Sequence, residues 1–213
     1  MCIRDRNYID ALLATWGMTL ESFAIAMVLA VAVTVMRVSP LKPLRVFGDL
    51  YVQVFRNIPG IALLIIVVYA LPPLKVVLPY RICVIVATVL LGSAFGSENF
   101  MSGINTVGVG QVEAARSLGM SFSRILAKIV IPQALRSSVL PMTNLFIAVM
   151  LTTALGSQVP LQPQELTGVV SYINTRSLGG VAAFFISALG YLGTAFVVSH
   201  IGNYIDKKVR ILR

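Results

Sequence analysis

Polar side chains that fall inside long apolar runs are the residues of this chain best suited to chemistry. A polar group inside a membrane is costly, and such groups commonly line the path of an ion or a solute. The candidates for such a path are Glu98, Asn99, Asn144, Thr152, Thr153 and Ser157. The same hydroxyl and amide groups could instead hydrogen-bond one helix to another, and the Glu98 carboxylate could simply reach the inner membrane interface. Residue type alone leaves both interpretations open.

A second group of polar residues lies in the segment 108–136, between two apolar runs. At helical spacing this segment has an apolar side and a polar side. The apolar side holds Val112, Ala115, Gly119, Phe122, Ile125 and Leu126, and the polar side holds Glu113, Arg116, Ser117, Ser123, Arg124 and Lys128. Gly119 permits a bend between two short helices, and Pro132 suits the first turn of the next helix. We expect two short helices on the inner membrane surface, which either let a partner approach closely at Ala114, Ala115 and Gly119 or only connect two spans.

The elements that must position these residues are strongly apolar. Hydrophobic residues make up 57% of the 213 residues and charged residues only 12%, and the mean hydropathy is +0.88. A soluble domain carries about 25% charged residues. Five charge-free intervals can each supply the apolar part of a spanning helix of about 20 residues. They lie between Glu21 and Arg37, between Arg56 and Lys75, between Arg81 and Glu98, from Ser137 to Gln164, and from Ser177 to Tyr204. The composition therefore predicts a membrane protein that crosses the bilayer several times.

We expect an all-α integral membrane protein with about five transmembrane helices in one domain. The expected spans are Trp16–Val38, Ile58–Leu78, Ile82–Gly103, Ala134–Leu155 and Gly179–Tyr204. A short helix, Leu44–Phe55, should lead into the second span, and the polar segment Gln158–Ser177 should form an outer loop with a short helix. Residues 1–13 are expected to stand apart from the transmembrane domain, 14–213, and the opening MCIRDR is interpreted as a non-native start.

The basic residues predict how the chain is oriented in the membrane. The net charge is +9, and twelve of the 17 lysines and arginines share one side if the N-terminus is outside and five helices cross. Because cytoplasmic loops carry the excess of basic residues, this distribution predicts N-out and C-in. It also explains the basic excess without a nucleic-acid partner. The two cysteines, Cys2 and Cys83, offer neither a disulfide framework nor the spacing of a metal site.

The residues EAARSLGMSFSRILAKIVIP, 113–132, match the pattern E-A-A, three residues, G, nine residues, I-x-L-P. Glu113, Ala114, Ala115, Gly119, Ile129 and Pro132 fit this pattern, with Ile131 in the leucine position. The segment resembles the EAA loop of permease subunits of bacterial ATP-binding-cassette importers. FRNIPGIALLIIVVYALP also resembles a segment of that family, and SENFMSGINTVGVGQVEAARSLGMSF resembles its polar amino-acid branch, glutamate-type systems in particular. The resemblance extends from about Ala14 to Arg213.

The resemblance implies that residues 108–132 form a coupling loop that docks on a cytoplasmic ATPase. The implied contact residues are Glu113, Ala114, Ala115, Arg116 and Gly119. No G-x-x-x-x-G-K-[ST] sequence occurs in the chain, so no cofactor is expected on it, and ATP with magnesium is expected on the partner ATPase dimer. The other implied partners are a second permease subunit, identical or paralogous, an extracytoplasmic substrate-binding protein, and the lipids of a bacterial inner membrane.

Three positions depart from the amino-acid branch. Met101 stands where an arginine commonly follows the glutamate by three residues, and Leu151 and Thr152 replace the charged pair of an L-K-D-T-S-L run. The expected function is a non-enzymatic subunit that forms half of the path of a polar amino acid, of glutamate type by resemblance, while a partner permease carries more of the specificity. The alternative is a secondary transporter or channel without an ATPase. Such proteins usually have internal repeats and several intramembrane charges, which fit this chain poorly.

Overall fold

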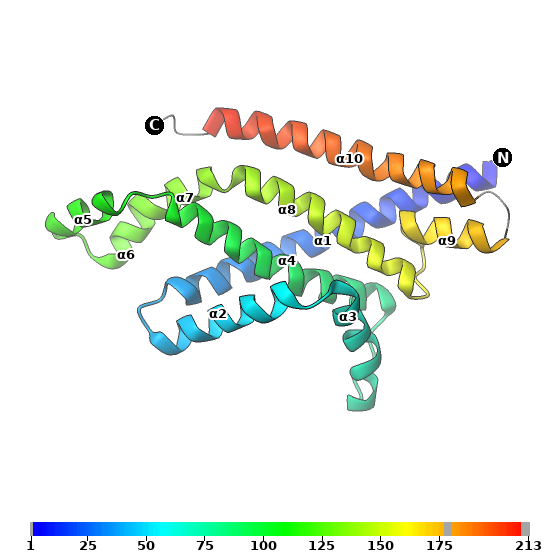
Figure 1. Cartoon of the computed structure of the whole chain (residues 1–213), viewed down its shortest axis with the longest axis horizontal. Helices are drawn as coiled ribbons and strands as arrows, with labels where there is room; N and C mark the ends of the chain where they lie inside the picture. Colours follow the sequence, from blue (N-terminus) through cyan, green and yellow to red (C-terminus); the bar gives the residue numbers. More distant parts are fainter. Residues whose placement is uncertain (1, 177–179, 210–213) are drawn as a thin grey trace.

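The computed structural model describes residues 2–176 and 180–209, and all regular structure in these residues is helical (Figure 1). The helices are α1 (Cys2–Val38), α2 (Lys42–Asn57), α3 (Gly60–Ile65), α4 (Tyr80–Asn105), α5 (Val109–Ser117), α6 (Phe122–Ile125), α7 (Ile131–Ser137), α8 (Val139–Thr152), α9 (Leu166–Arg176) and α10 (Gly180–Val209). Further helical turns at Ile66–Ala70 and Pro72–Leu74 follow α3, one at Leu126–Val130 joins α6 to α7, and one at Thr153–Gln158 follows α8. The predicted all-α fold is confirmed over the described residues.

Four helical segments are long and apolar enough to cross a membrane. They are Tyr8–Val38, Tyr80–Asn105, Val139–Gln158 and Gly180–Val209, and they correspond to the first, third, fourth and fifth predicted spans. The limits differ by a few residues, and Gly179, where the fifth span was expected to begin, lies outside the described residues. The backbone of α1 is one continuous helix from Cys2, so the boundary expected after residue 13 coincides with no break in the helix.

The second predicted span, Ile58–Leu78, is present as the helical segment Gly60–Leu74, which is bent sharply away from the helix before it. The helix expected at Leu44–Phe55 is present as α2, but the helical segment Gly60–Leu74 meets it at 103°. Ile58 takes an extended conformation before Pro59, because proline disfavours the helical conformation of the residue that precedes it. The projecting segment, Gly60–Leu74, therefore leaves the bundle almost at a right angle (Figure 1), and the bent pair counts as a fifth span only when taken together.

Small residues bring α1 and α4 into close contact. A Cβ atom added to Gly92 would lie 3.3 Å from the Cβ of Ala26, and one added to Gly96 would lie 2.8 Å from the Cβ of Ala30. Lipid is as apolar as the side chains, so helices in a membrane are held together mainly by close van der Waals packing and hydrogen bonds. α2 packs on α1 at the buried Gly48, where an added Cβ atom would lie 2.8 Å from Cγ of Arg37. The α1–α4 pair is thus the support on which the neighbouring helices rest.

A buried carboxylate fixes α9 near the end of the bundle where the N-terminus lies (Figure 1). The side chain of Glu165 is 0% exposed and accepts hydrogen bonds from the N–H groups of Thr167 and Gly168 and, at 3.0 Å, from the Tyr191 hydroxyl of α10. The hydroxyl of Thr15 in α1 accepts a hydrogen bond from the first N–H group of α9 at 3.2 Å. These bonds satisfy the amide groups that begin a helix. They also tie α9, the short helix expected in this region, to α1 and α10.

The Glu165→Gln variant should show a weaker dependence of stability on pH than the parent protein. Burial raises the pKa of the Glu165 carboxyl, and the hydrogen bonds that it accepts only partly oppose this effect. A carboxyl with a higher pKa in the folded than in the unfolded state binds its proton more tightly when folded. The stability that this proton contributes is present at low pH and is lost as the pH rises through the raised pKa. Thermal unfolding of both proteins in mildly acidic and mildly alkaline buffers measures the difference, and equal pH dependence would contradict the assignment.

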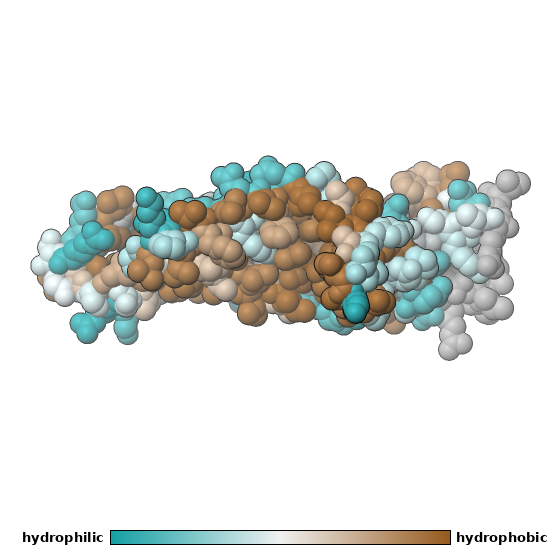
Figure 2. All heavy atoms as spheres, turned by 90° about the horizontal axis from the view of Figure 1, so that it is seen from below, coloured by the Kyte–Doolittle hydropathy of each residue, from teal (hydrophilic) through white to brown (hydrophobic). Residues whose placement is uncertain are grey.

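The outer surface of the bundle is largely apolar. Figure 2 shows a broad hydrophobic region between two ends that are richer in hydrophilic residues. Only 11% of the most apolar 18-residue stretch of α10 is buried. Its exposed large side chains include Val181, Phe184, Phe185, Leu189, Leu192 and Phe196. Such a surface is suited to contact with lipid rather than water.

Candidate functional site

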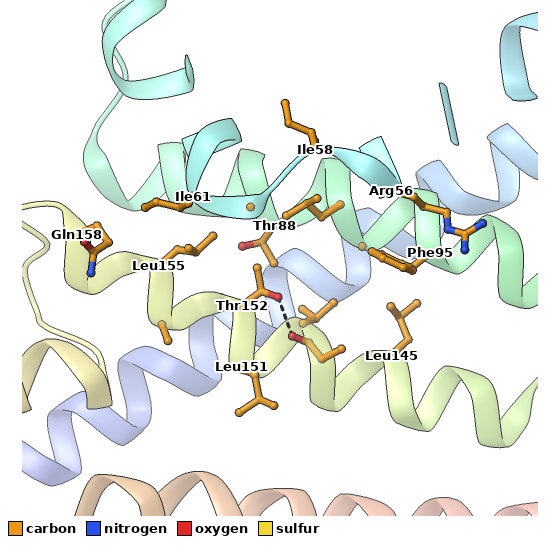
Figure 3. Close-up of a pocket in the computed structure, with 16 residues that line it drawn as sticks. Arg56, Ile58, Ile61, Thr88, Phe95, Leu145, Leu151, Thr152, Leu155 and Gln158 are labelled. Carbon is orange, nitrogen blue, oxygen red and sulfur yellow. Dashed lines mark hydrogen bonds between the residues drawn. The ribbon is translucent and has the colours of Figure 1, made fainter. Parts of the chain in front are cut away.

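A cavity of about 630 Å³ lies between the break that follows α2, the middle of α4 and the C-terminal half of α8 (Figure 3). It is lined by Arg56, Ile58, Gly60, Ile61, Thr88, Leu91, Gly92, Phe95, Leu145, Ala148, Val149, Leu151, Thr152, Ala154, Leu155 and Gln158. Sites for small molecules have volumes of about 300–1,000 Å³ and are mainly apolar with a few polar groups. The cavity has both properties, and we treat it as the candidate site.

Few polar side chains line the cavity, and one of them has an unsatisfied hydroxyl. The hydroxyl of Thr152 donates to the carbonyl oxygen of Ala148 at 2.8 Å (Figure 3). Thr88 is 1% exposed, and its Oγ1 has no hydrogen-bond partner among the residues that the structure describes. A buried polar group without a partner costs about 1–3 kcal/mol.

A chain of four ionic side chains lies beside the cavity, where α1, α2 and α4 meet. The Nε of Arg37 lies 2.8 Å from Oδ1 of Asp49, and its Nη2 lies 2.8 Å from Oε1 of Glu98. The Nη1 of Arg56 lies 3.4 Å from Oε2 of Glu98. The Arg37 side chain is 13% exposed and the Arg56 side chain 42%. The ionic chain Asp49–Arg37–Glu98–Arg56 is therefore neutral as a whole, and Arg56 is its open end toward the cavity.

This ionic chain was not predicted from the sequence. The presence of Met101 in place of the expected arginine argued against an ion pair at Glu98. The structure instead supplies two arginines from other helices, Arg37 from α1 and Arg56 from α2. Arg56 was expected only as one of the basic residues of an inner loop. Charges that lie this far apart in sequence give no spacing pattern, so their contact depends on how the helices pack.

The predicted path residues are divided between the cavity and the helix contacts. Thr152 lines the cavity, and Glu98 forms an ion pair with the lining residue Arg56. Asn144 is exposed on α8, one turn before the lining residue Ala148. These three residues are therefore in or beside the candidate site.

The other three predicted path residues make hydrogen bonds within or between helices. The side-chain amide of Asn99 donates to the carbonyl oxygen of Pro141 at 3.1 Å, which joins α4 to α8. Thr153 is fully buried and donates to the carbonyl oxygen of Met150, and Ser157 donates to a carbonyl oxygen of its own turn. These contacts agree with the alternative interpretation of such hydroxyl and amide groups, in which they form hydrogen bonds to the helices instead of lining a path. None of them lines the cavity.

The lining residues of α4 were not predicted from the sequence either. Thr88, Leu91, Gly92 and Phe95 recur every three or four residues and therefore share one face of α4. This spacing was visible in the sequence. Because α4 is apolar on nearly every face, however, the spacing does not reveal which face the neighbouring helices leave open.

The segment predicted to couple to a partner forms a separate helix pair at one end of the bundle (Figure 1). α5 ends in a turn in which Gly119 has φ +75°. The N–H of Met120 donates to the carbonyl oxygen of Ala115 at 3.1 Å, and the N–H of Gly119 donates to that of Arg116 at 2.9 Å. These two bonds define a Schellman motif, in which glycine is preferred because the backbone is left-handed. The bend predicted at Gly119 is present, and Pro132 lies in the first turn of α7 as predicted.

The helix pair has a small apolar core of its own. The buried members of this core are Val107, Ala115, Ile125 and Val130. Ala115 is 4% exposed and faces the core, whereas Gly119 and Phe122, which were expected on the apolar face, are exposed. The residues left on the outside form what we call the α5 surface, which consists of Glu113, Ala114, Arg116, Leu118 and Gly119. Leu118 is 82% exposed at its centre.

A helical membrane bundle with a broken helix over a solute-sized cavity and an exposed helix pair at one end has the architecture of a membrane transport subunit. Residues 22–211 match the family model described as the binding-protein-dependent transport system inner membrane component. The chain belongs to this family, and the resemblance inferred from the EAA pattern is confirmed.

Relatives with established names are permease proteins of amino-acid transport systems. The chain is 32% identical over 197 residues to the L-cystine transport system permease protein TcyB of Bacillus subtilis, which covers 92% of this chain and 83% of that protein. It is 33% identical over 199 residues to the glutamate transport system permease protein GluC of Corynebacterium efficiens, with 87% and 86% covered. These matches span most of both proteins, so they concern the whole subunit and not only the EAA segment.

Solved structures share the fold. The crystal structure of an amino acid ABC transporter with histidines matches with a TM-score of 0.91 at 24% identity, over 98% of this chain and 96% of that one. The inward-facing MetNI methionine ABC transporter matches with a TM-score of 0.78 at 20% identity, over 96% and 97%. At these identities the likeness shows the fold and leaves the residues of the cavity to be interpreted on their own.

Proposed function

We propose that this chain is the permease subunit of an ATP-binding-cassette importer of polar amino acids in a bacterial inner membrane, and that its cavity forms half of the translocation path. The cavity carries the proposal, because it is a solute-sized space with a few polar groups between membrane helices. The names of relatives support an amino acid as the solute, since they include permeases for L-cystine, glutamine and glutamate. The basic residues support the orientation N-out and C-in.

The α5 surface is the proposed contact with a cytoplasmic ATPase dimer, which holds ATP and magnesium. Glu113, Ala114, Arg116 and Gly119 offer charge and close approach there, while Ala115 supports the surface from behind. The helix pair can move as a unit because it has its own core. α7 follows the pair directly and packs against α4 at Gly103, so a displacement of the pair is passed to a helix that lines the cavity. Such a transfer is how ATP binding would drive alternating access.

A second permease subunit and an extracytoplasmic substrate-binding protein complete the proposed assembly. The projecting segment Gly60–Leu74 supports a second subunit, because Ile65, Tyr69 and Leu74 are at least half exposed on it. The cavity also opens beside this segment, at Gly60 and Ile61. A facing subunit would bury these side chains and enclose the other half of the path.

Reconstitution in liposomes tests this function. The chain together with its ATPase, its permease partner and its binding protein should take up an amino acid only when ATP is supplied on the ATPase side. The chain without the ATPase should show no uptake, whether or not an ion gradient is imposed. Uptake by the chain alone, driven by an ion gradient, would replace the importer with a secondary transporter.

A further inference from the structure

We propose that Arg56 is the carboxylate receptor of the cavity, and that it exchanges its contact with Glu98 for the carboxylate of the transported solute. The inference rests on the proposed function, because it concerns the same cavity. It goes beyond that function by naming the receiving residue, the group that it releases, and the class of solute that fits.

Arg56 has hydrogen-bond donors to spare. A guanidinium group carries five N–H donors. The side chain has one ionic contact, at 3.4 Å to Glu98, and its guanidinium carbon lies 5.6 Å from the centre of the Phe95 ring. Within the described residues no other polar partner is recorded for it, and it is 42% exposed at the edge of the cavity. A guanidinium with free donors pairs well with a carboxylate, because the two groups can form two parallel hydrogen bonds.

Arg37 shows by contrast what a structural arginine in the same ionic chain looks like. Its guanidinium contacts Asp49 and Glu98, both at 2.8 Å, and the Ser97 hydroxyl at 3.2 Å. Its side chain is only 13% exposed, and it does not line the cavity. Arg37 therefore holds α1, α2 and α4 together, and Arg56 is left as the arginine that can receive a ligand.

Glu98 can release Arg56 at a small cost. Its Oε1 remains 2.8 Å from Arg37 after the release, so the carboxylate keeps its shorter and stronger ionic contact. The contact that is given up, at 3.4 Å, is the longest in the ionic chain. A solute carboxylate in the apolar cavity would form closer hydrogen bonds with Arg56. The exchange keeps Glu98 paired and changes how α2, which carries Arg56, is held to α4.

The charge of the lining defines the solute class. Arg56 is the one charged residue among those that line the cavity, and no lining residue is acidic. Thr88, with its unpartnered hydroxyl, Thr152 and Gln158 provide neutral polar contacts. A solute with a carboxylate and an uncharged or acidic side chain fits this lining. A solute with a cationic side chain would bring a second cationic group, in addition to its α-ammonium group, into a lining that has no acidic residue.

Equilibrium binding to the permease pair and its ATPase in lipid nanodiscs, without the substrate-binding protein that would bind the same probes, tests the inference. The probes are the amino acid that the parent complex takes up best among L-glutamine, L-glutamate and L-cystine, and the ester of its α-carboxyl group. Arg56→Gln should weaken binding of the free amino acid by about tenfold or more, the value of a charge-assisted hydrogen bond, and change binding of the ester by less than about twofold. Glu98→Gln should tighten binding of the free amino acid, because it removes the carboxylate that competes for Arg56.

The matched control is Arg81→Gln. Arg81 forms an ion pair with Glu21, with 2.6 Å between Nη2 and Oε1, and neither residue lines the cavity. Loss of the Arg81 charge should therefore leave binding of both probes unchanged. Equal weakening by Arg56→Gln and Glu98→Gln would overturn the inference, because it would show that Arg56 acts only within the ionic chain. If Arg56→Gln does not assemble with the ATPase, the parent complex decides: it must bind the free amino acid about tenfold more tightly than the ester, and equal binding overturns the inference. Failure of the parent to take up any of the three amino acids would instead refute the proposed function.

Discussion

Valine at position 119 should reduce ATP-dependent transport by the assembled complex to background, while the helical bundle keeps its thermal stability. Gly119 has φ +75°, where an L-residue costs about 1–2 kcal/mol and a β-branched residue more. A Cβ atom there would meet nothing within 4 Å, so the substitution causes no clash inside the chain. The cost therefore falls on the Schellman turn that presents the α5 surface. Uptake by liposomes measures transport, co-purification measures the contact with the ATPase, and thermal unfolding measures the stability of the bundle.

Gly108→Val is the matched control for this prediction. Gly108 precedes α5 in the same segment, has nothing within 4 Å of an added Cβ, and has φ −61°, which valine adopts readily. Transport by this variant should stay close to that of the parent. If Gly119→Val transports as well as Gly108→Val, the α5 surface is not the coupling contact.

Alanine at position 103 should destabilise the protein by about 1–3 kcal/mol or more, the usual cost of overpacking, and abolish transport. A Cβ atom on Gly103 would lie 2.6 Å from the carbonyl oxygen of Ala134 and would also collide with the Ser138 hydroxyl. Ala134 lies in α7 and Ser138 directly follows this helix. The carbonyl group of Ala134 is part of the backbone, so it cannot rotate away as a side chain can. α4 and α7 would have to separate, which removes the connection between the cavity and the helix pair. Thermal unfolding and ATP-dependent uptake measure the two effects.

Gly193→Ala provides the comparison in α10. An added Cβ at Gly193 meets nothing within 4 Å, and alanine is favoured over glycine in a helix interior by about 1 kcal/mol. Its stability should equal or exceed that of the parent. A Gly103→Ala variant as stable and active as Gly193→Ala would show that the α4–α7 contact does not transmit movement.

Features that depend on local sequence were predicted well. The charge-free intervals predicted the long helices, because an apolar run of this length must satisfy its backbone hydrogen bonds internally in a membrane. The turn at Gly119 was predicted because glycine leaves its backbone dihedrals free. The position of Pro132 in the first turn of α7 was predicted because proline restricts its backbone dihedrals. The EAA pattern identified the family for a similar reason, since it occupies one short segment.

The bend before the second span is a feature that neighbouring residues in the sequence did not predict. The apolar residues of this span were recognised from the sequence. The sharp bend at Ile58–Pro59 was not, because its angle of 103° depends on how α2 packs on α1 and α4. The same bend forms one wall of the cavity, so the site could not be outlined without it.

By itself, the sequence determined that this is a helical membrane protein of a transport family with a turn at Gly119 between two spans, because hydrophobic length, glycine and proline preferences and a short motif are properties of neighbouring residues. Only the tertiary structure decided which face of α4 lines a cavity, that Ala115 supports the α5 surface from inside, and that Glu98 is shared by Arg37 and Arg56. These features are contacts between helices that are far apart in the chain. Their geometry is set by close packing at small residues such as Gly48, Gly92 and Gly96, and it leaves no periodic signal in any one segment.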